Sequence, residues 1–555
     1  MCCSKSTIAV DPDPPPGAAQ AQRPIVGRPH LLASEPAPPA APKGEPRPWW
    51  ESRAFVAAMI ALAFVPLLYP PVPPLVDLLG HMGRYRVELD VGSSPDLQRY
   101  YSFQWHLIGN LGVDLLIVPL AKLVGLEMAV KLIAMSIPPL TVAGFLWVAR
   151  EVHNRLPPTA ALALPFALSH PFLFGFLNYT LAMALAFLAF ALWLRLGRLG
   201  KTRLRAMLFV PISFLLFVCH TFGWGTLGLL CFSAEAVRQH DKGISWWRAA
   251  IKAALHASVM AGPVLLMLAW RSDVAGAPTH GWFNWVGKGW WVAQALRDRW
   301  HWVDISILVA IGLCGLLALA TRWFTLSRNL AFSAMVLAVA FVLLPWTVFG
   351  SAYADMRLAP FVMAVIVLGI RTKSKPPFAF ANVLAVVATS LFVAKVATTT
   401  ASLSIASDRQ DRQLAALDLV PRGAALVYLV GQPCTTIWPL FRESHLGAMA
   451  IVRRHAFSND QWAIDGANLL TVHYRPAGHF RADASQMVSD QRCRRPKSPP
   501  VDVAMRAIPR SAFDHVWLVD VPRFDPASLG GYREIWSGEG SALYAKSSPA
   551  AKEAP

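Results

Sequence analysis

The chain has 555 residues, of which 55% are hydrophobic and only 15% are charged. A soluble protein carries about a quarter of charged residues, so this composition excludes an ordinary soluble enzyme. Several apolar runs approach the roughly 20 residues needed to cross a bilayer, which predicts a mainly α-helical, polytopic membrane protein. The formal net charge of +18 does not require a nucleic-acid partner, because basic residues gather in the cytoplasmic loops of membrane proteins and no nucleic-acid-binding module is present.

Residues 1–50 are rich in proline and alanine and lack apolar periodicity, which is typical of a disordered tail. The basic residues that precede the first span place this tail in the cytoplasm: Arg23, Arg28, Lys43, Arg47 and Arg53. In the predicted transmembrane domain, residues 51–400, clusters of Lys and Arg alternate with short, nearly uncharged turns. This alternation predicts about eleven spans with the N-terminus inside and the C-terminus outside. The predicted spans are 54–69, 128–149, 159–174, 176–194, 206–220, 222–237, 250–270, 303–321, 329–349, 356–371 and 378–396.

The first outer loop, residues 70–127, opens with four prolines that end the preceding helix. If a helix restarts after them, Asp77, His81, Arg84 and Glu88 recur at intervals of four, three and four, which places them on one face. The alternative is the solvated face of an ordinary amphipathic helix. The other side of this predicted helix is apolar and is expected to rest on the bilayer surface. Its residues are Leu78, Leu79, Met82 and Leu89.

Residues 107–121 are apolar enough for a span, yet they contain Asn110 and Asp114. An Asp at mid-membrane costs about 2.5–3.5 kcal/mol, and counting this segment would reverse the sidedness of every later loop. His106, Asn110 and Asp114 are spaced by four and share one helix face. We therefore interpret 96–121 as an interfacial or re-entrant element of the first outer loop.

The second long outer loop, residues 271–302, is rich in tryptophan and contains Lys288. Tryptophan in such a loop usually belongs to an interfacial belt. The alternative is stacking against a sugar or contact with a lipid headgroup. The aromatic residues concerned are Trp282, Phe283, Trp285, Trp290 and Trp291.

Residues 401–547 are more polar and predict a small extracytoplasmic α/β domain, followed by a flexible tail at 548–555. Cys434 and Cys493 are expected to pair if this region faces an oxidising compartment. We find no catalytic motif in the domain, and no Cys or His spacing in the chain indicates a metal or a cofactor. Three apolar runs predict buried strands: 424–430, 515–521 and 541–545.

Polar groups near membrane depth are functional candidates. Asp355 and Arg357 lie in a predicted outward turn, on the same side as Asp77. A guanidinium there can bind phosphate oxygens in a bidentate manner, and the alternative is a surface pair between Asp355 and Arg357. Three more polar residues border other outward turns, although a lone His in such a place is more often structural: His170, Asn178 and His220.

The order of parts over roughly residues 54–550 resembles the GT-C class of membrane glycosyltransferases. The shared parts are one span, a large outer loop opening with an Asp, about ten further spans and an outer C-terminal domain. The stretches VDLLGHMGR at 76–84 and GFLNY at 175–179 also resemble uncharacterised bacterial membrane proteins grouped near that class. The resemblance implies a multi-pass enzyme of the bacterial inner membrane that moves a sugar, with inversion, from a polyprenyl-phosphate donor. The acceptor would be a saccharide, lipid or protein at the extracytoplasmic face.

The resemblance also implies roles for residues. Asp77 would be the general base, and Arg357 would hold the phosphate of a hexosyltransferase-type donor, whose leaving group needs no general acid. A transporter or flippase of lipid-linked saccharides is the main competing hypothesis, although no internal repeat supports it. Two weaker hypotheses are a ligase that joins whole saccharides and a non-catalytic membrane scaffold. The remaining candidate substrate-binding residues are His81, Arg84, His106, Asp114, His170, Asn178, His220 and Asp355.

Overall fold

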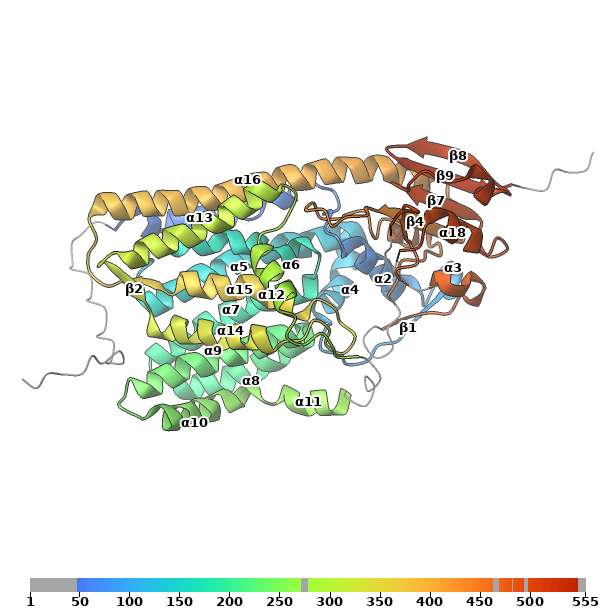
Figure 1. The fold of residues 1–555 in the computed structure, drawn as a ribbon. Helices are drawn as coiled ribbons and strands as arrows, with labels where there is room; N and C mark the ends of the chain where they lie inside the picture. Colours follow the sequence, from blue (N-terminus) through green and yellow to red (C-terminus); the bar gives the residue numbers. More distant parts are fainter. Residues whose placement is uncertain (1–46, 271–277, 463–468, 482, 494–497, 548–555) are drawn as a thin grey trace, which may run out of the picture. The chain divides into compact units, whose positions relative to one another are not determined.

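The described chain is mainly helical and carries a small sheet near its C-terminus (Figure 1). The structure is a computed structural model. Most of the predicted tail at 1–50, and all of the predicted tail at 548–555, lie outside the residues that it describes. It describes residues 47–547 apart from 271–277, 463–468, 482 and 494–497.

Five helices are long and apolar enough to cross a membrane, by length and composition. Three further apolar stretches of the described chain are shorter, at 53–67, 160–173 and 328–343. The chain is therefore a multi-pass membrane protein, but the predicted number of eleven spans is not confirmed. The five long helices are α5 (Leu126–His153), α7 (Leu177–Arg198), α8 (Thr202–Cys219), α13 (His301–Ala320) and α16 (Phe378–Leu414).

Proline divides two of the predicted spans into shorter pieces, because it lacks the N–H of the α-helical hydrogen bond and its ring clashes with the preceding turn. The span predicted at 159–174 is a 3-10 helix with Pro165 inside it, followed by a single α-turn. The span predicted at 250–270 breaks before Pro263. The resulting pieces are η3 (Ala160–Leu168), α6 (His170–Leu173), α10 (Trp246–Ala257), η4 (Ser258–Met260) and α11 (Pro263–Trp270).

In the first outer loop, the apolar side of α2 (Leu78–Asp90) faces protein. Leu78, Leu79 and Met82 are at most 1% exposed, and α2 packs along α17 (Ala448–Arg454) of the C-terminal region. The expectation that this side rests on the bilayer was therefore wrong, because the C-terminal region covers it. The other elements of the loop are α3 (Pro95–Gln98), β1 (Tyr101–Phe103) and α4 (Gly112–Val124).

The C-terminal sheet has five strands in the order β6-β4-β7-β9-β8. Its two central strands are buried along their length, apart from the last residue of β4, and pair in parallel, as expected for continuous apolar runs covered on both faces. The three strands predicted from the sequence are present as β4, β7 and β9. Their predicted burial is confirmed for β4 and β7, whereas β9 is buried only at Ser541 and Leu543. The strands are β4 (Leu426–Gln432), β6 (Met487–Ser489), β7 (His515–Val519), β8 (Tyr532–Gly538) and β9 (Ser541–Lys546).

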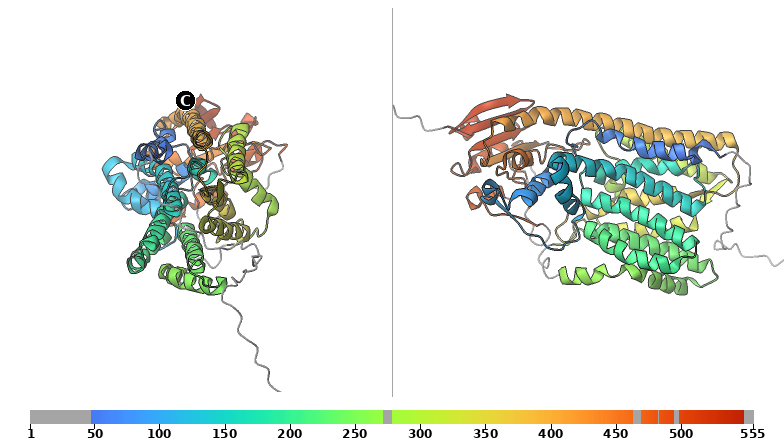
Figure 2. Two further views of the ribbon diagram at one scale, coloured as in Figure 1. Left: turned by 90° about the vertical axis from the view of Figure 1, so that its left-hand side faces the viewer. Right: turned by 180° about the vertical axis from the view of Figure 1, so that it is seen from behind.

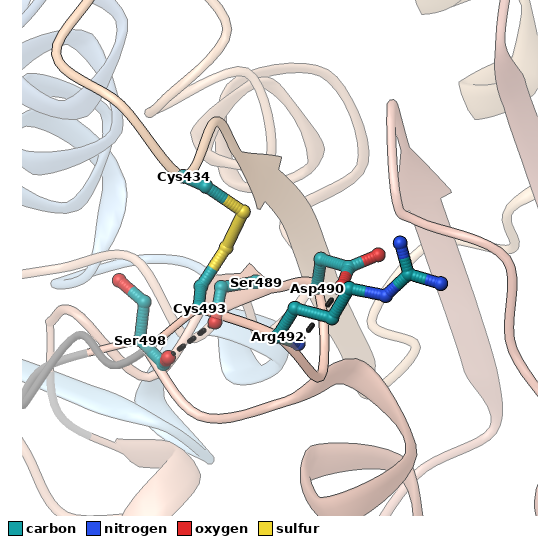
Figure 3. The surroundings of a disulfide bond; sticks show 6 residues. All are labelled: Cys434, Ser489, Asp490, Arg492, Cys493 and Ser498. Atoms are coloured by element: carbon teal, nitrogen blue, oxygen red, sulfur yellow. Dashed lines mark hydrogen bonds between the residues drawn. A yellow bond between two sulfur atoms is a disulfide. The ribbon is translucent and has the colours of Figure 1, made fainter.

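A disulfide joins Cys434 to Cys493, with 5.2 Å between their Cα atoms (Figure 3). It ties the loop after β4 to the segment after β6. Beside it, the Ser489 hydroxyl donates to the Ser498 carbonyl oxygen at 2.7 Å. The pairing predicted from the sequence is therefore present.

The first outer loop and the C-terminal region share a β-ladder and pack against each other. Strand β1 pairs antiparallel with β5 (Leu470–Val472), which lies far along the chain in the C-terminal region. Figure 2 shows these two regions from two further directions. Helix α16 carries the chain from the apolar helices to the sheet, where Arg409 pairs with Asp520 at 2.5 Å. The remaining elements are η1 (Trp49–Glu51), α1 (Arg53–Leu62), η2 (Val65–Leu67), α9 (Thr221–His240), α12 (Trp285–Ala293), β2 (Phe324–Leu326), α14 (Arg328–Leu343), α15 (Ala354–Leu368), β3 (Ile370–Thr372), η5 (Ala415–Leu419), η6 (Arg475–Arg481), α18 (Val501–Ala507) and η7 (Pro526–Leu529).

Candidate active site

Asp77 occupies the N-terminal cap of α2 and is held by its backbone against the turn 174–176. Its N–H donates to the Phe174 carbonyl oxygen at 2.8 Å. Gly175 has a φ of +97°, which favours glycine, and a Cβ at this position would lie 2.9 Å from the Asp77 nitrogen. The Asp77 side chain remains 16% exposed. The turn therefore fixes the backbone of Asp77 while its carboxylate stays accessible.

Arg357 contacts the same turn from the first part of α15. Its Cζ atom lies 4.2 Å from the centroid of the Phe176 ring. One terminal nitrogen donates to the Ser351 hydroxyl at 3.1 Å, whereas Nε has no hydrogen-bond partner within the described part of the chain. Arg357 is only 8% exposed. Its Nε–H group therefore remains available to a ligand beside the turn that holds Asp77.

Burial raises the pKa of the Asp77 carboxyl well above its ordinary value, and the negative charge of Asp483 raises it further. The positive charge of Arg357 acts in the opposite direction. A carboxylate in such surroundings is a stronger base than one in water, which suits the removal of a proton from a hydroxyl.

Aromatic rings border the same turn. The Tyr353 ring lies 5.4 Å from that of Phe174 and 6.0 Å from that of Trp291. The His170 ring lies 5.8 Å from that of Phe174, and neither of its nitrogens has a partner among the described residues. The His220 ring lies 5.5 Å from that of Tyr179. Tyr179 itself donates to the Arg357 carbonyl oxygen at 2.6 Å.

The tryptophan side chains of the loop 271–302 have two different surroundings. Trp291 reaches the rings beside the site, while Trp282, Trp285 and Trp290 are each at least 55% exposed. Lys288 points inward as well and is only 3% exposed.

Arg84, Asp114 and Asn178 form a cluster of their own. An ion pair of 2.8 Å joins Arg84 to Asp114, and both side chains are buried. The Asn178 amide donates to Asp114 at 3.1 Å and to the Asn110 carbonyl oxygen at 2.9 Å, while its own oxygen accepts from the Val113 N–H. These contacts join α2, α4 and α7. The three predicted substrate-binding residues thus contact one another across three helices.

Three other predicted residues have different surroundings. Asp355 pairs with the Lys288 ammonium at 3.2 Å, so the alternative of an Asp355–Arg357 surface pair was wrong. Both side chains are buried. His106 is exposed in the segment before α4. His81 lies one turn after Asp77, where its ring is 4.9 Å from that of Trp462 and burial lowers its pKa well below the ordinary value.

The C-terminal domain contributes groups that the sequence did not indicate. The Nε2 atom of His445 lies 3.9 Å from Asp77 Oδ1. Asp460 is fully buried nearby, and burial with the charge of Asp483 raises its pKa to about 7. These residues occupy irregular segments, where no periodicity relates one side chain to another. The only sequence signal was a group of polar residues beside a short helix, at 442–445.

In the part of the chain that the structure describes, no cluster of three or more His, Cys, Asp or Glu side chains could hold a metal ion. The chain matches no protein-family model and no curated protein. Among solved structures it is similar to the apo crystal structure of ArnT from Cupriavidus metallidurans. The TM-score is 0.48 at 13% sequence identity, over 89% of this chain and 97% of that chain.

Proposed function

We propose that this protein is a membrane glycosyltransferase that moves a sugar from a polyprenyl-phosphate donor to a hydroxyl acceptor at the extracytoplasmic face. The observation that carries the proposal is that Asp77 and Arg357 meet at one three-residue turn. A base and a phosphate-binding cation at one site are the two groups that this reaction needs.

Asp77 removes the proton from the acceptor hydroxyl as the hydroxyl oxygen attacks the anomeric carbon. The bond from that carbon to the phosphate oxygen breaks, and the electron pair leaves with the polyprenyl phosphate. Because this leaving group is already a stable anion, it requires no proton. A single displacement inverts the configuration at the anomeric carbon.

Arg357 binds the donor phosphate through the guanidinium nitrogens that its protein neighbours leave free. Charge grows on the phosphate as the bond breaks, so a fixed cation stabilises the transition state more than the bound donor. Tyr353, Trp291 and Phe174 offer ring faces for the sugar beside the reacting atoms. The polyprenyl tail would lie among the apolar helices.

The disulfide supports the proposed location. Disulfides persist in oxidising compartments, so the bond between Cys434 and Cys493 fits a domain on the extracytoplasmic side. Asp77 shares that side, because α2 packs against the same domain. The expected location is the inner membrane of a bacterium.

Purified protein in liposomes, supplied with radiolabelled polyprenyl-phosphate sugars and a panel of acceptors, tests the proposal. Asp77→Asn should reduce transfer by about 10²–10⁴-fold, the usual contribution of a general base. Asp90→Asn is the matched control, because Asp90 lies at the other end of α2 and pairs with Arg86. Equal transfer by wild type and Asp77→Asn would refute the role of Asp77. Movement of the labelled lipid across the bilayer without sugar transfer would favour a transporter.

A further inference from the structure

The C-terminal domain places one histidine beside each end of α2. At the N-terminal end, His445 Nε2 lies 3.9 Å from Asp77 Oδ1. At the C-terminal end, His455 Nε2 lies 3.5 Å from Asp90 Oδ2. The two pairs differ in their surroundings. The His445 side chain is 5% exposed and lies at the proposed site. His455 is held at Nδ1 by Ser94 and Arg422, at 2.8 and 2.7 Å.

We propose that His445 is a positioning residue for Asp77: it orients the carboxylate and receives the proton that Asp77 takes from the acceptor. The inference rests on the proposed function. It assigns to the C-terminal domain a part in the reaction itself.

The segment that carries His445 is anchored to the backbone around Asp77. Arg442 donates to the Pro74 carbonyl oxygen, three residues before Asp77, and pairs with Asp298 at 2.6 Å. Gln461 donates to the Gly80 carbonyl oxygen at 3.2 Å. A Cβ at Gly80 would lie 2.7 Å from the Trp462 ring and 3.0 Å from the His445 ring, so glycine is what permits this approach.

Burial and neighbouring charges act on both members of the pair. Burial lowers the pKa of His445, and the charge of Asp483 opposes that effect. Burial and Asp483 both raise the pKa of Asp77. These shifts lower the proton affinity of the His445 imidazole relative to that of the Asp77 carboxyl, so the proposed transfer rests on the 3.9 Å approach of the two groups. The other charged or titratable neighbours are His81, Tyr353, Arg357 and Asp460.

An acceptor seated against Asp77 covers the 16% of its side chain that is exposed. The proton on Asp77 can then pass to His445, whose Nε2 atom lies 3.9 Å from Asp77 Oδ1. It passes from the acceptor oxygen to the Asp77 carboxylate, then to His445 Nε2, and reaches solvent when product leaves. No other atom is gained or lost, so the relay resets the base for the next cycle.

The test compares His445→Gln and His445→Ala with His455→Gln as the matched control, in the same liposome assay. We expect His445→Gln to lower kcat by roughly 10–100-fold, the range found for partners that orient a reacting group. The acid limb of its pH profile should move to higher pH, because a protonated imidazole beside Asp77 favours the ionised carboxylate and a glutamine does not. Added imidazole should restore transfer by His445→Ala. His455→Gln should change neither kcat nor the pH profile.

Two results would overturn the inference and leave the proposed function standing. One is unchanged transfer by His445→Gln. The other is a loss without a moved acid limb and without rescue by imidazole, which indicates packing alone. Limited proteolysis of the C-terminal domain shows whether each variant keeps the native fold. Asp77→Asn, measured in parallel, tests the role of Asp77 itself, because full activity in that variant would refute Asp77 as the base and, with it, the role of His445.

Discussion

Two buried arginines lie near the first outer loop, and their partners differ. Arg84 pairs with Asp114 at 2.8 Å inside a cluster that joins three helices. Arg357 stacks on the Phe176 ring and forms no ion pair among the described residues, and the Nε atom of each arginine lacks a hydrogen-bond partner there. A buried cation is costly unless it is neutralised, so Asp114 compensates Arg84, whereas under the proposed function the donor phosphate would compensate Arg357. The contrast distinguishes a structural charge from one available to a ligand.

The largest effect on activity is expected at Arg357. Arg357→Gln should lower kcat by about 10²–10³-fold, because the charge on the departing phosphate loses its fixed partner. The native fold should persist, since no carboxylate is left unpaired. Arg357→Lys should recover only part of the loss, because an ammonium cannot bind two phosphate oxygens in parallel. Transfer rates with one polyprenyl-phosphate sugar measure both variants. Equal rates in all three proteins would contradict the assignment.

At Arg84 the expected loss is in stability. Arg84→Met leaves Asp114 buried without its cation, which typically costs about 3–5 kcal/mol. Thermal unfolding in detergent should show a clearly lowered Tm. The double variant Arg84→Met with Asp114→Leu should regain part of it, because no unpaired charge remains. A single variant as stable as wild type would show that Arg84 is not neutralised as described.

The contrast between the arginines also shows what the sequence could reveal. Helical spacing correctly placed Asp77 and Arg84 on one polypeptide segment, and charge alternation placed Asp77 and Arg357 on one side. Spacing within a helix says nothing about the partner from another helix, so the pairing of Arg84 with Asp114 was not predicted. His106 was predicted to share a helix face with Asp114, but it lies before α4 begins at Gly112, so helical spacing does not relate the two side chains.

The C-terminal domain shows the same limit. Its central strands were predictable because buried parallel strands are continuous apolar runs. His445 was not, because it lies in an irregular segment whose path depends on long-range contacts with Pro74 and Gly80. Hydropathy also does not register how proline divides an apolar run, so two of the predicted spans are broken helices rather than single ones.

The pH dependence of transfer should respond to substitution of Arg357 but not to substitution of Arg84. Because burial raises the pKa of Asp77, transfer by wild type should fall as pH decreases through a range well above the ordinary carboxyl pKa. Arg357 lowers that pKa, so Arg357→Gln should move the acid limb to still higher pH. Arg84→Met, where it folds, should show the same acid limb in its pH profile as wild type. Profiles of kcat between pH 5 and 9 measure the shift, and coincident limbs in wild type and Arg357→Gln would contradict it.

The smallest effect concerns Glu88, the second carboxyl near Arg84. Burial and the charge of Asp114 raise its pKa to about 9, against the opposite influence of Arg84. Between its ordinary pKa and about 9 the folded protein holds this proton and the unfolded chain does not, so stability falls as pH rises across that window, by at most about 1.4 kcal/mol per pH unit. Glu88→Gln should remove the decline and exceed wild type in Tm most at pH 9. Glu127→Gln, whose carboxylate pairs with Arg453 at the surface, should retain the decline. Parallel Tm curves for wild type and Glu88→Gln would mean that Arg84 neutralises both carboxylates.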